Sequence, residues 1–264
     1  MLKMNNITKT FNSGTVDERV ALDHLSLTLR DGDFVTVIGG NGAGKSTMQN
    51  AICGTWQPDE GSIELDGVNV SSLPEYKRAR YLGRVYQDPM MGTAPDMQLE
   101  ENLALAYRRG KKLGLRWHIN REERDMYRER LRELNLGLED RLTTKVGLLS
   151  GGQRQAVTLL MASLQKPRLL LLDEHTAALD PATAAKVLEL SDRIVQENGL
   201  TTMMITHNMK DAIRHGNRLI MMNKGEIIFD CRGEEKAKLT VEDLLEKFAQ
   251  ISGSTLDNDR ALLG

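Results

Sequence analysis

The chain has 264 residues, and its 35 lysines and arginines against 37 aspartates and glutamates leave a formal net charge of −2. This length suits one domain, or one domain with an inserted lobe, and 40% hydrophobic residues suffice for a buried core. The near-zero charge excludes a global attraction to nucleic acid or to an acidic membrane surface, and we expect no nucleic-acid partner.

The cysteines and the apolar runs bear on the cellular compartment. Only Cys53 and Cys231 are present, far apart and without CxxC spacing. We therefore expect two reduced thiols in or near the core, rather than a disulfide framework or a zinc site. No apolar run approaches the about 20 residues of a membrane-spanning helix, and the N-terminus lacks the apolar core of a signal peptide. Work at a membrane would require a partner protein.

The N-terminal part of the chain predicts strands separated by turns. Loosely alternating or continuous apolar segments predict strands at 2–8, 21–29, 34–38 and 63–65. A glycine-rich turn follows the third of these strands, and the next segment, 45–53, predicts a helix.

The character of the chain changes between about 90 and 148. The segment 121–135 is highly charged, which is typical of a solvated helix face. Its apolar residues fall on the opposite helical face: Met126, Tyr127, Leu131 and Leu134. We expect a helical lobe inserted in an α/β core.

Alternation of strands and helices resumes after this lobe. The strand expected at 169–173 is continuously apolar, a pattern typical of burial on both faces. Asp180 is suited to cap the helix that follows it. The remaining expected elements are helices at 150–164 and 181–197, a strand at 202–206, a hairpin of 219–222 with 226–229, and an amphipathic helix from about 240.

The turn at 39–47, GGNGAGKST, carries the pattern G-x-x-x-x-G-K-[ST] between a strand and a helix. Its glycines allow backbone N–H groups to converge on phosphate oxygens, and the helix N-terminus favours anions. Lys45 supplies positive charge to the β- and γ-phosphates, Ser46 a hydroxyl for Mg²⁺, and Thr47 a contact on the α-phosphate side. We expect the whole loop to bind nucleotide: Gly39, Gly40, Asn41, Gly42, Ala43, Gly44, Lys45, Ser46 and Thr47. Gly40 is expected to make the loop more flexible.

An acidic pair ends the apolar strand at 169–173. The run LLLLDE delivers Asp173 and Glu174 to the carboxyl edge of the sheet, where open α/β sheets bind ligands. Asp173 is suited to hold Mg²⁺ through its water shell, and Glu174 to polarise the water that attacks the γ-phosphate. An apolar run ending in Asp-Glu is a weak signal alone, but downstream of a phosphate loop it indicates an ATPase that uses Mg²⁺.

The segment 149–155, LSGGQRQ, resembles the signature motif of ABC ATPases. Ser150 is suited to cap a helix, and Gly151 and Gly152 allow close approach of a phosphate. We expect Gln153 to contribute to the same contact with the nucleotide. The resemblance extends over about 2–235. It implies an α/β fold, with a P-loop NTPase core, an antiparallel β subdomain and an inserted α-helical subdomain.

The resemblance also predicts domain limits. We expect a single ABC ATPase domain over 1–240, with the helical subdomain at about 88–148, and a C-terminal helix and tail over 241–264.

Further residues match motifs of that family in the family's order. Gln87 resembles the Q-loop glutamine, which touches Mg²⁺ or the attacking water. Asp180, in the run ALD, resembles the D-loop, and His207 resembles the switch histidine that contacts the γ-phosphate. Phe11 lies where the family places an aromatic ring that stacks on adenine, although ordinary core packing also explains it. The resemblance thus implies Lys45, Gln87, Glu174 and His207 as catalytic.

The family's mechanism needs two nucleotide-binding domains, which sandwich each ATP between the phosphate loop of one and the Ser150 turn of the other. With one copy of each motif, the chain is expected to form a homodimer or to pair with a related subunit. The resemblance further implies transmembrane permease subunits, a substrate-binding protein if the transporter is an importer, and a place at the cytoplasmic face of the cell membrane. The lobe at 88–148 should receive the permease, with Tyr107 and Arg108 as candidate contacts or as part of a solvated face.

Two other classes of protein fit the sequence less well. A soluble ABC ATPase of translation or DNA repair usually carries tandem domains or long coiled-coil inserts, and this chain has neither. A non-hydrolysing module would lack Glu174 or His207, and both are present. Import is favoured over export because the ATPase is a chain without transmembrane spans, although some exporters are split in this way.

His175 departs from the family pattern, in which proline usually follows the acidic pair. The run DEHTAALD resembles that of bacterial ATPases associated with amino-acid importers, including aromatic amino acids. We expect the departure to leave Glu174 in place, and the transported substrate is set by other chains.

Overall fold

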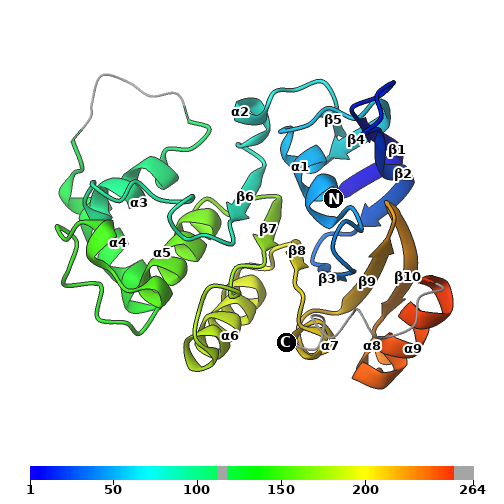
Figure 1. The fold of residues 1–264 in the computed structure, drawn as a ribbon. Helices are drawn as coiled ribbons and strands as arrows, with labels where there is room; N and C mark the ends of the chain where they lie inside the picture. Colours follow the sequence, from blue (N-terminus) through cyan, green and yellow to red (C-terminus); the bar gives the residue numbers. More distant parts are fainter. Residues whose placement is uncertain (112–117, 253–264) are drawn as a thin grey trace. The chain divides into compact units, whose positions relative to one another are not determined.

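The computed structural model describes residues 1–111 and 118–252. The chain forms two compact units, coloured along the sequence in Figure 1. The first consists of Met1–Arg78 and Gly199–Gly264, and the second of Ala79–Asn198. The lobe expected at 88–148 lies inside the second unit, and the expected tail, 253–264, lies outside the described residues.

An antiparallel sheet of four strands belongs to the first unit. Its strands follow the order β2-β1-β4-β5. They are β1 (Leu2–Phe11), β2 (Arg19–Leu29), β4 (Glu60–Leu65) and β5 (Val68–Asn69). Leu2, Met4, Leu27 and Leu29 bury one face, as alternation with period two requires. The sheet confirms the expected antiparallel β subdomain.

A second group of strands in this unit carries the phosphate loop. The strand β3 (Phe34–Ile38) pairs in parallel with β8 (Thr202–Ile205) and β9 (Arg218–Asn223), and β9 forms a hairpin with β10 (Glu226–Arg232). Every residue of β3 is buried, which explains why four of its five residues are apolar. The helix α1 (Lys45–Cys53) follows β3, at the boundaries expected from the sequence.

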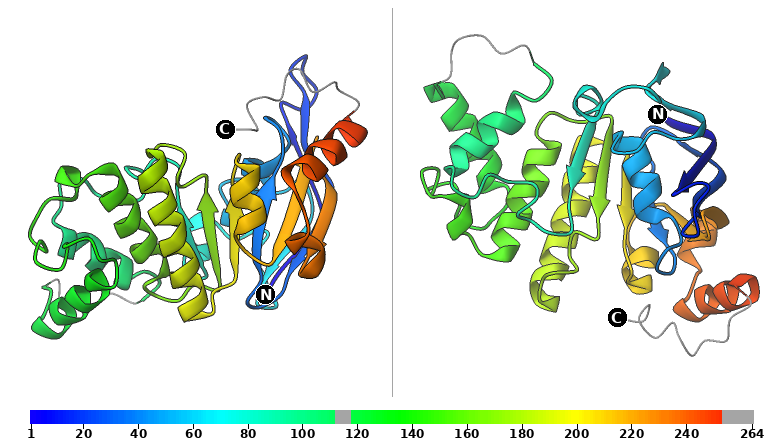
Figure 2. Two further views of the ribbon diagram at one scale, coloured as in Figure 1. Left: turned by 90° about the horizontal axis from the view of Figure 1, so that it is seen from below. Right: turned by 45° about the horizontal axis from the view of Figure 1, so that its top comes forward.

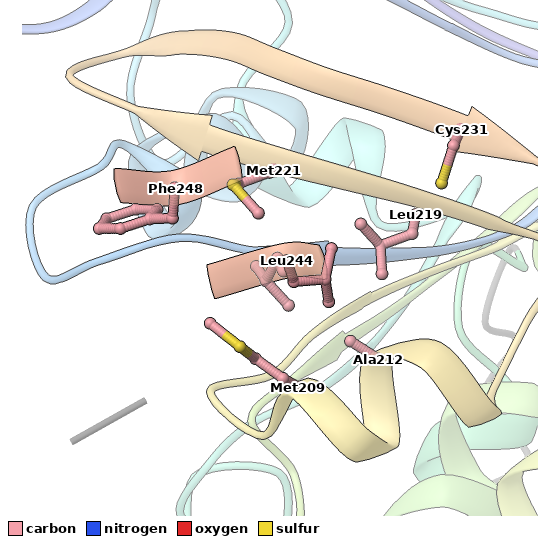
Figure 3. Close-up of a cluster of buried hydrophobic side chains, with 8 residues drawn as sticks. Met209, Ala212, Leu219, Met221, Cys231, Leu244 and Phe248 are labelled. Carbon is pink, nitrogen blue, oxygen red and sulfur yellow. The ribbon is translucent and has the colours of Figure 1, made fainter. Parts of the chain in front are cut away.

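Helices at the C-terminal end cover the hairpin of the first unit. They are α7 (Met209–Arg214), α8 (Glu234–Ala237) and α9 (Val241–Ser252), while the short α2 (Glu75–Arg78) ends the N-terminal part of this unit. Figure 2 shows α9 alongside the β9–β10 hairpin. Leu244 and Phe248 of α9 pack with Met209, Leu219 and Met221 in one apolar cluster (Figure 3). The amphipathic pattern of α9 is therefore explained by burial against its own unit.

The second unit combines two parallel strands with helices. The strand β6 (Leu82–Val85) pairs with β7 (Leu169–Asp173) in register, Val85 opposite Leu172. The helices are α3 (Leu99–Tyr107), α4 (Arg121–Arg132), the 3₁₀ turn η1 (Val146–Leu148), α5 (Gly151–Ser163) and α6 (Pro181–Asn198). Within the described residues no helix is long and apolar enough to cross a membrane.

The charged helix α4 follows the predicted pattern. Tyr127, Leu131 and Leu134 are buried and Met126 is half-buried, which confirms the apolar face. Asn120 caps the helix by accepting from the Glu123 backbone N–H at 2.8 Å. The neighbouring segment 112–117 lies outside the described residues.

Both cysteines are buried free thiols, Cys53 at the end of α1 and Cys231 in β10, as predicted. Burial raises the pKa of the Cys231 thiol to about 11. Because the thiolate is the nucleophile, iodoacetamide at pH 8 should alkylate Cys231 at least about 100-fold more slowly in the folded Cys53→Ser variant than in the same variant unfolded in urea. Equal rates, measured by mass spectrometry, would show that this thiol is accessible.

Candidate functional site

The phosphate loop at 39–47 joins β3 to α1 in the first unit. Gly39 has φ of 153°, and a Cβ on it would lie 2.3 Å from the Met222 carbonyl oxygen. Only glycine therefore permits the loop to leave β3 so close to β9. The Ser46 side chain lies exposed on the first turn of α1 and Thr47 is half-buried, so the hydroxyl of Ser46 is accessible to a cation. A Cβ at Gly40 would meet Phe248 at 3.5 Å, an ordinary contact with α9.

Lys45 lies within the curl of this loop. Its Nζ donates to the carbonyl oxygens of Gly39 at 2.6 Å and Gly40 at 3.2 Å, and the residue is 5% exposed. A buried ammonium is costly unless its donors are satisfied, so these carbonyls hold the charge at the loop. This places one cation and the N-terminus of α1 together, an arrangement that fits a phosphate.

Phe11 is connected to the same loop through Arg19 on the neighbouring strand β2. Phe11 faces Arg19 in the β1–β2 ladder, and Arg19 Nη2 donates to the Gly42 carbonyl oxygen at 2.9 Å. The Phe11 ring packs edge to face against Trp56, with ring centroids 5.2 Å apart. Arg19 was not singled out from the sequence, because nothing in a lone arginine indicates a distant carbonyl partner.

His207 also belongs to the first unit. The Thr206 backbone N–H donates to the Val37 carbonyl oxygen at 3.2 Å, which extends the pairing of β8 with β3. His207 therefore leaves the sheet at the edge where the phosphate loop begins. Asn208 then caps α7 by accepting from the Lys210 backbone N–H at 2.9 Å. The first unit thus brings together Phe11, the phosphate loop and His207.

The acidic pair lies at the carboxyl end of β7 in the second unit. Asp173 Oδ2 is 3.3 Å from Arg84 Nη2 on the neighbouring strand β6. Glu174 follows with φ of 46°, a left-handed conformation that is uncommon for a residue with a side chain. Both acidic side chains are half-buried. The arginine partner was not anticipated from the sequence.

Ser150 begins α5 as the sequence predicted. Its Oγ accepts from the Gln153 backbone N–H at 3.3 Å, and Gln153 Oε1 accepts from the Ser150 backbone N–H at 3.2 Å. Asp180 caps α6 in the same way, accepting from the Thr183 backbone N–H at 3.1 Å. Hydrogen bonds from Thr183 hold the pKa of Asp180 below its usual range.

The two glycines after Ser150 have different surroundings. A Cβ on Gly152 would lie 2.2 Å from Thr183 Cγ2, whereas a Cβ on Gly151 would lie 3.4 Å from Leu179 Cδ2. Gly152 therefore serves the packing of α5 against the first turn of α6, in addition to the phosphate approach expected from the sequence.

Gly152→Ala should lower the free energy of unfolding by about 1–3 kcal/mol, because the new methyl group collides with Thr183. Gly151→Ala is the matched control and should change it by less than about 0.5 kcal/mol. Urea unfolding of both variants checks this difference. Equal effects at the two positions would refute the packing role of Gly152.

Gln87 is exposed just after β6, in the second unit. The preceding carbonyl oxygen, that of Tyr86, accepts from Gln155 Nε2 of α5 at 3.2 Å. Gln155 is fully buried and belongs to the same LSGGQRQ run as Ser150. This bond joins the segment of Gln87 to the helix that Ser150 caps, a link that sequence spacing could not indicate.

A cavity of about 510 Å³ opens beside the start of α5. Ser150, Gly152, Gln153, Thr183, Lys186 and Arg193 contribute to its lining. Lys186 and Arg193 are the cationic residues of this lining. The second unit holds Gln87, the Ser150 turn, the acidic pair and Asp180.

Comparison with known proteins decides the family. A family model described as ABC transporter matches residues 22–177, more than half of the chain. The chain belongs to the ABC transporter family. Membership implies ATPase activity in general terms, and it accounts for one polypeptide carrying the phosphate loop, the acidic pair and the LSGGQRQ run.

Relatives of this ABC protein include importer subunits. A tyrosine transport ATP-binding protein of Clostridioides difficile (strain R20291) is 47% identical over 249 residues, which cover 94% of this chain and 98% of that protein. A methionine import ATP-binding protein of Escherichia coli (strain K12) is 34% identical, over 98% of this chain and 72% of that protein. The chain is accordingly an ABC ATP-binding subunit of importer-like type.

Solved ABC cassettes share the fold. A dimeric ATP-binding cassette in a post-hydrolysis state, bound to ADP and Pi, superposes with a TM-score of 0.74 at 30% identity, over 88% of this chain and 98% of that one. The ADP conformation of another cassette gives a TM-score of 0.76 at 27% identity, over 94% of this chain and 98% of that one. The α/β P-loop fold of ABC ATPases is thereby confirmed.

Proposed function

We propose that this ABC subunit binds ATP with Mg²⁺ and hydrolyses it to ADP and phosphate. The observation that carries the proposal is the phosphate loop, where Lys45 is held among the loop carbonyls at the start of α1. Ser46 and Asp173 would hold Mg²⁺, which neutralises phosphate charge when bound. Glu174 orients and polarises the attacking water, Gln87 touches Mg²⁺ or that water, and His207 contacts the γ-phosphate.

Half of each site belongs to a second copy of the chain or to a related subunit. The Ser150 turn offers a hydroxyl and the N-terminus of α5, which together suit an anion. In support, the cassette bound to ADP and Pi described above is dimeric. ATP bound between the phosphate loop of one copy and the Ser150 turn of the other favours the closed dimer, and hydrolysis releases it.

The dimer drives an amino-acid importer from the cytoplasmic face of the membrane, together with permease subunits and a substrate-binding protein. Support comes from the relatives named for tyrosine transport and methionine import. The identity of 47% over nearly the whole chain favours an aromatic amino acid as the substrate.

The permease docks on the second unit near the segment after Gln87. Met91 and Leu148 are 68% and 73% exposed. Arg154 connects the two segments, since it contacts Met90 Sδ and donates to the Gly147 carbonyl oxygen at 2.9 Å. An exposed apolar face of this kind is typical of a protein interface.

The candidate contacts Tyr107 and Arg108 are occupied within the unit. Arg108 forms an ion pair with Glu123 at 3.1 Å, and the Tyr107 ring packs against Tyr127 and lies 3.6 Å from Lys111 Nζ. We therefore place the first contacts of the permease at Met91 and Leu148 instead.

Cysteine crosslinking tests the docking face. Both native cysteines are buried, so Met91→Cys and Leu148→Cys should crosslink to the permease that co-purifies with this chain. Tyr76→Cys is the matched control, because Tyr76 is 74% exposed but belongs to the first unit. Crosslinks from Tyr76→Cys alone would reject this face.

Uptake of radiolabelled tyrosine by vesicles containing the complex should require ATP. Uptake of other solutes only would reject the proposed substrate class.

A further inference from the structure

His175 is a buried residue to which the proposed function gives no task. It follows Glu174 directly and is 2% exposed. Its Nε2 lies 2.9 Å from the Oγ of Ser191 on α6, and Ser191 is 1% exposed. Burying polar groups is unfavourable unless they are hydrogen-bonded, and an apolar side chain would fill this part of the core without such a bond. The contact between His175 and α6 therefore suggests a role beyond packing.

The direction of the hydrogen bond follows from Ser191. Its Oγ also donates to the Val187 carbonyl oxygen at 2.8 Å, one turn earlier in α6. A hydroxyl has one proton, so toward His175 the Ser191 Oγ acts as an acceptor. The N–H at His175 Nε2 is therefore the donor of the hydrogen bond to the Ser191 Oγ. Loss of either partner leaves the other polar group buried without this bond.

The backbone beside His175 is held in an uncommon conformation. Glu174 has φ of 46°, and such a conformation persists only when the surrounding structure enforces it. On one side, Asp173 ends β7, which is paired with β6. On the other side, the Ala177 backbone N–H donates to the Glu174 carbonyl oxygen at 2.9 Å, and the His175 side chain is anchored on α6.

We propose that His175 is a positioning residue for ATP hydrolysis, which holds the left-handed backbone of Glu174 through its bond to Ser191 and so aims the Glu174 carboxylate. The proposal rests on the proposed function, in which Glu174 acts on the attacking water. The same bond ties the acidic pair to α6, the helix that Asp180 caps.

Steady-state hydrolysis by the full chain tests this role. His175→Leu and Ser191→Ala should each lower kcat about 10- to 100-fold, since small misplacement of a catalytic group has effects of that size. The KM for ATP should change by less than about twofold, because the phosphate loop is untouched. The double variant should be no slower than the slower single variant, as expected for two ends of one interaction.

Two further variants separate the hydrogen bond from packing. His175→Gln keeps an N–H donor of similar reach and should restore kcat to within about threefold of the wild type. Ser163→Ala removes another buried serine hydroxyl that bonds within its own helix, donating to the Leu159 carbonyl oxygen at 2.9 Å. It should leave kcat unchanged. If His175→Leu fails to fold, the remaining two variants still test the proposal. Ser191→Ala removes the acceptor of the hydrogen bond, and His175→Gln keeps a donor.

The outcomes distinguish this proposal from the function on which it rests. Wild-type kcat in both Ser191→Ala and His175→Leu, with Glu174→Gln inactive, would overturn only the positioning role. The same holds if His175→Gln is as slow as His175→Leu, since the loss would then follow from packing. Wild-type hydrolysis by Glu174→Gln would instead overturn the assignment of the catalytic base.

Discussion

The Glu174→Gln variant should bind ATP with the affinity of the wild type and hydrolyse it about 100- to 10,000-fold more slowly, the range lost with a general base. The amide has nearly the shape of the carboxylate but cannot accept a proton from water. Phosphate release measures the rate, and calorimetric titration with ATP measures the affinity.

The structure explains why this substitution should slow hydrolysis and leave ATP binding unchanged. Glu174 is half-buried after β7, while Lys45 begins α1 and the loop proposed to bind phosphate joins β3 to α1. Changing one carboxylate therefore leaves the binding loop intact. Glu197→Gln, an exposed position on α6, is the matched control and should hydrolyse at the wild-type rate. Unchanged turnover in Glu174→Gln would falsify its role as the base.

The Lys45→Ala variant should lose ATP affinity. Hydrogen bonds to a charged group contribute about 1.5–3 kcal/mol, which corresponds to a fall of about 10- to 100-fold in affinity. The Lys45 ammonium is held by the Gly39 and Gly40 carbonyl oxygens, within the loop where the phosphates are expected to bind. Calorimetric titration with ATP measures the loss.

Lys210→Ala is the control for Lys45→Ala, since Lys210 is an exposed lysine on α7 of the same unit. It should bind ATP with wild-type affinity. Equal affinity of Lys45→Ala and Lys210→Ala would show that the loop at 39–47 does not hold the phosphates.

Elements with strong local signals were predicted with their boundaries. The strand β3 and the helix α1 begin and end where the apolar run and the glycine turn indicated, and β7 ends at Asp173 as expected. The strand β6, of four residues, and the helix α7, of six, were missed. Segments this short carry too few residues to show a periodicity, and neighbours distant in sequence stabilise them.

The residues of the candidate site also divide into those with a local sequence signal, which were predicted, and those without one, which were missed. The glycines and the caps Ser150 and Asp180 were predicted because their roles depend on local backbone geometry. Arg19, Arg84 and Gln155 were missed because each acts on a partner brought near only by folding. His175 was noticed as a departure from a pattern, but its anchor on Ser191 became visible only in the structure.

We expect two copies of the chain to hold ATP between them. Sedimentation velocity of Glu174→Gln tests it most directly, because this variant should retain bound ATP. We expect a monomer without nucleotide, a dimer with saturating ATP, and a monomer with ATP when Ser150→Arg is added, since Ser150 is proposed to contact the ATP bound by the other copy. A Glu174→Gln chain that binds ATP and still sediments as a monomer would contradict the proposed ATP-bound dimer.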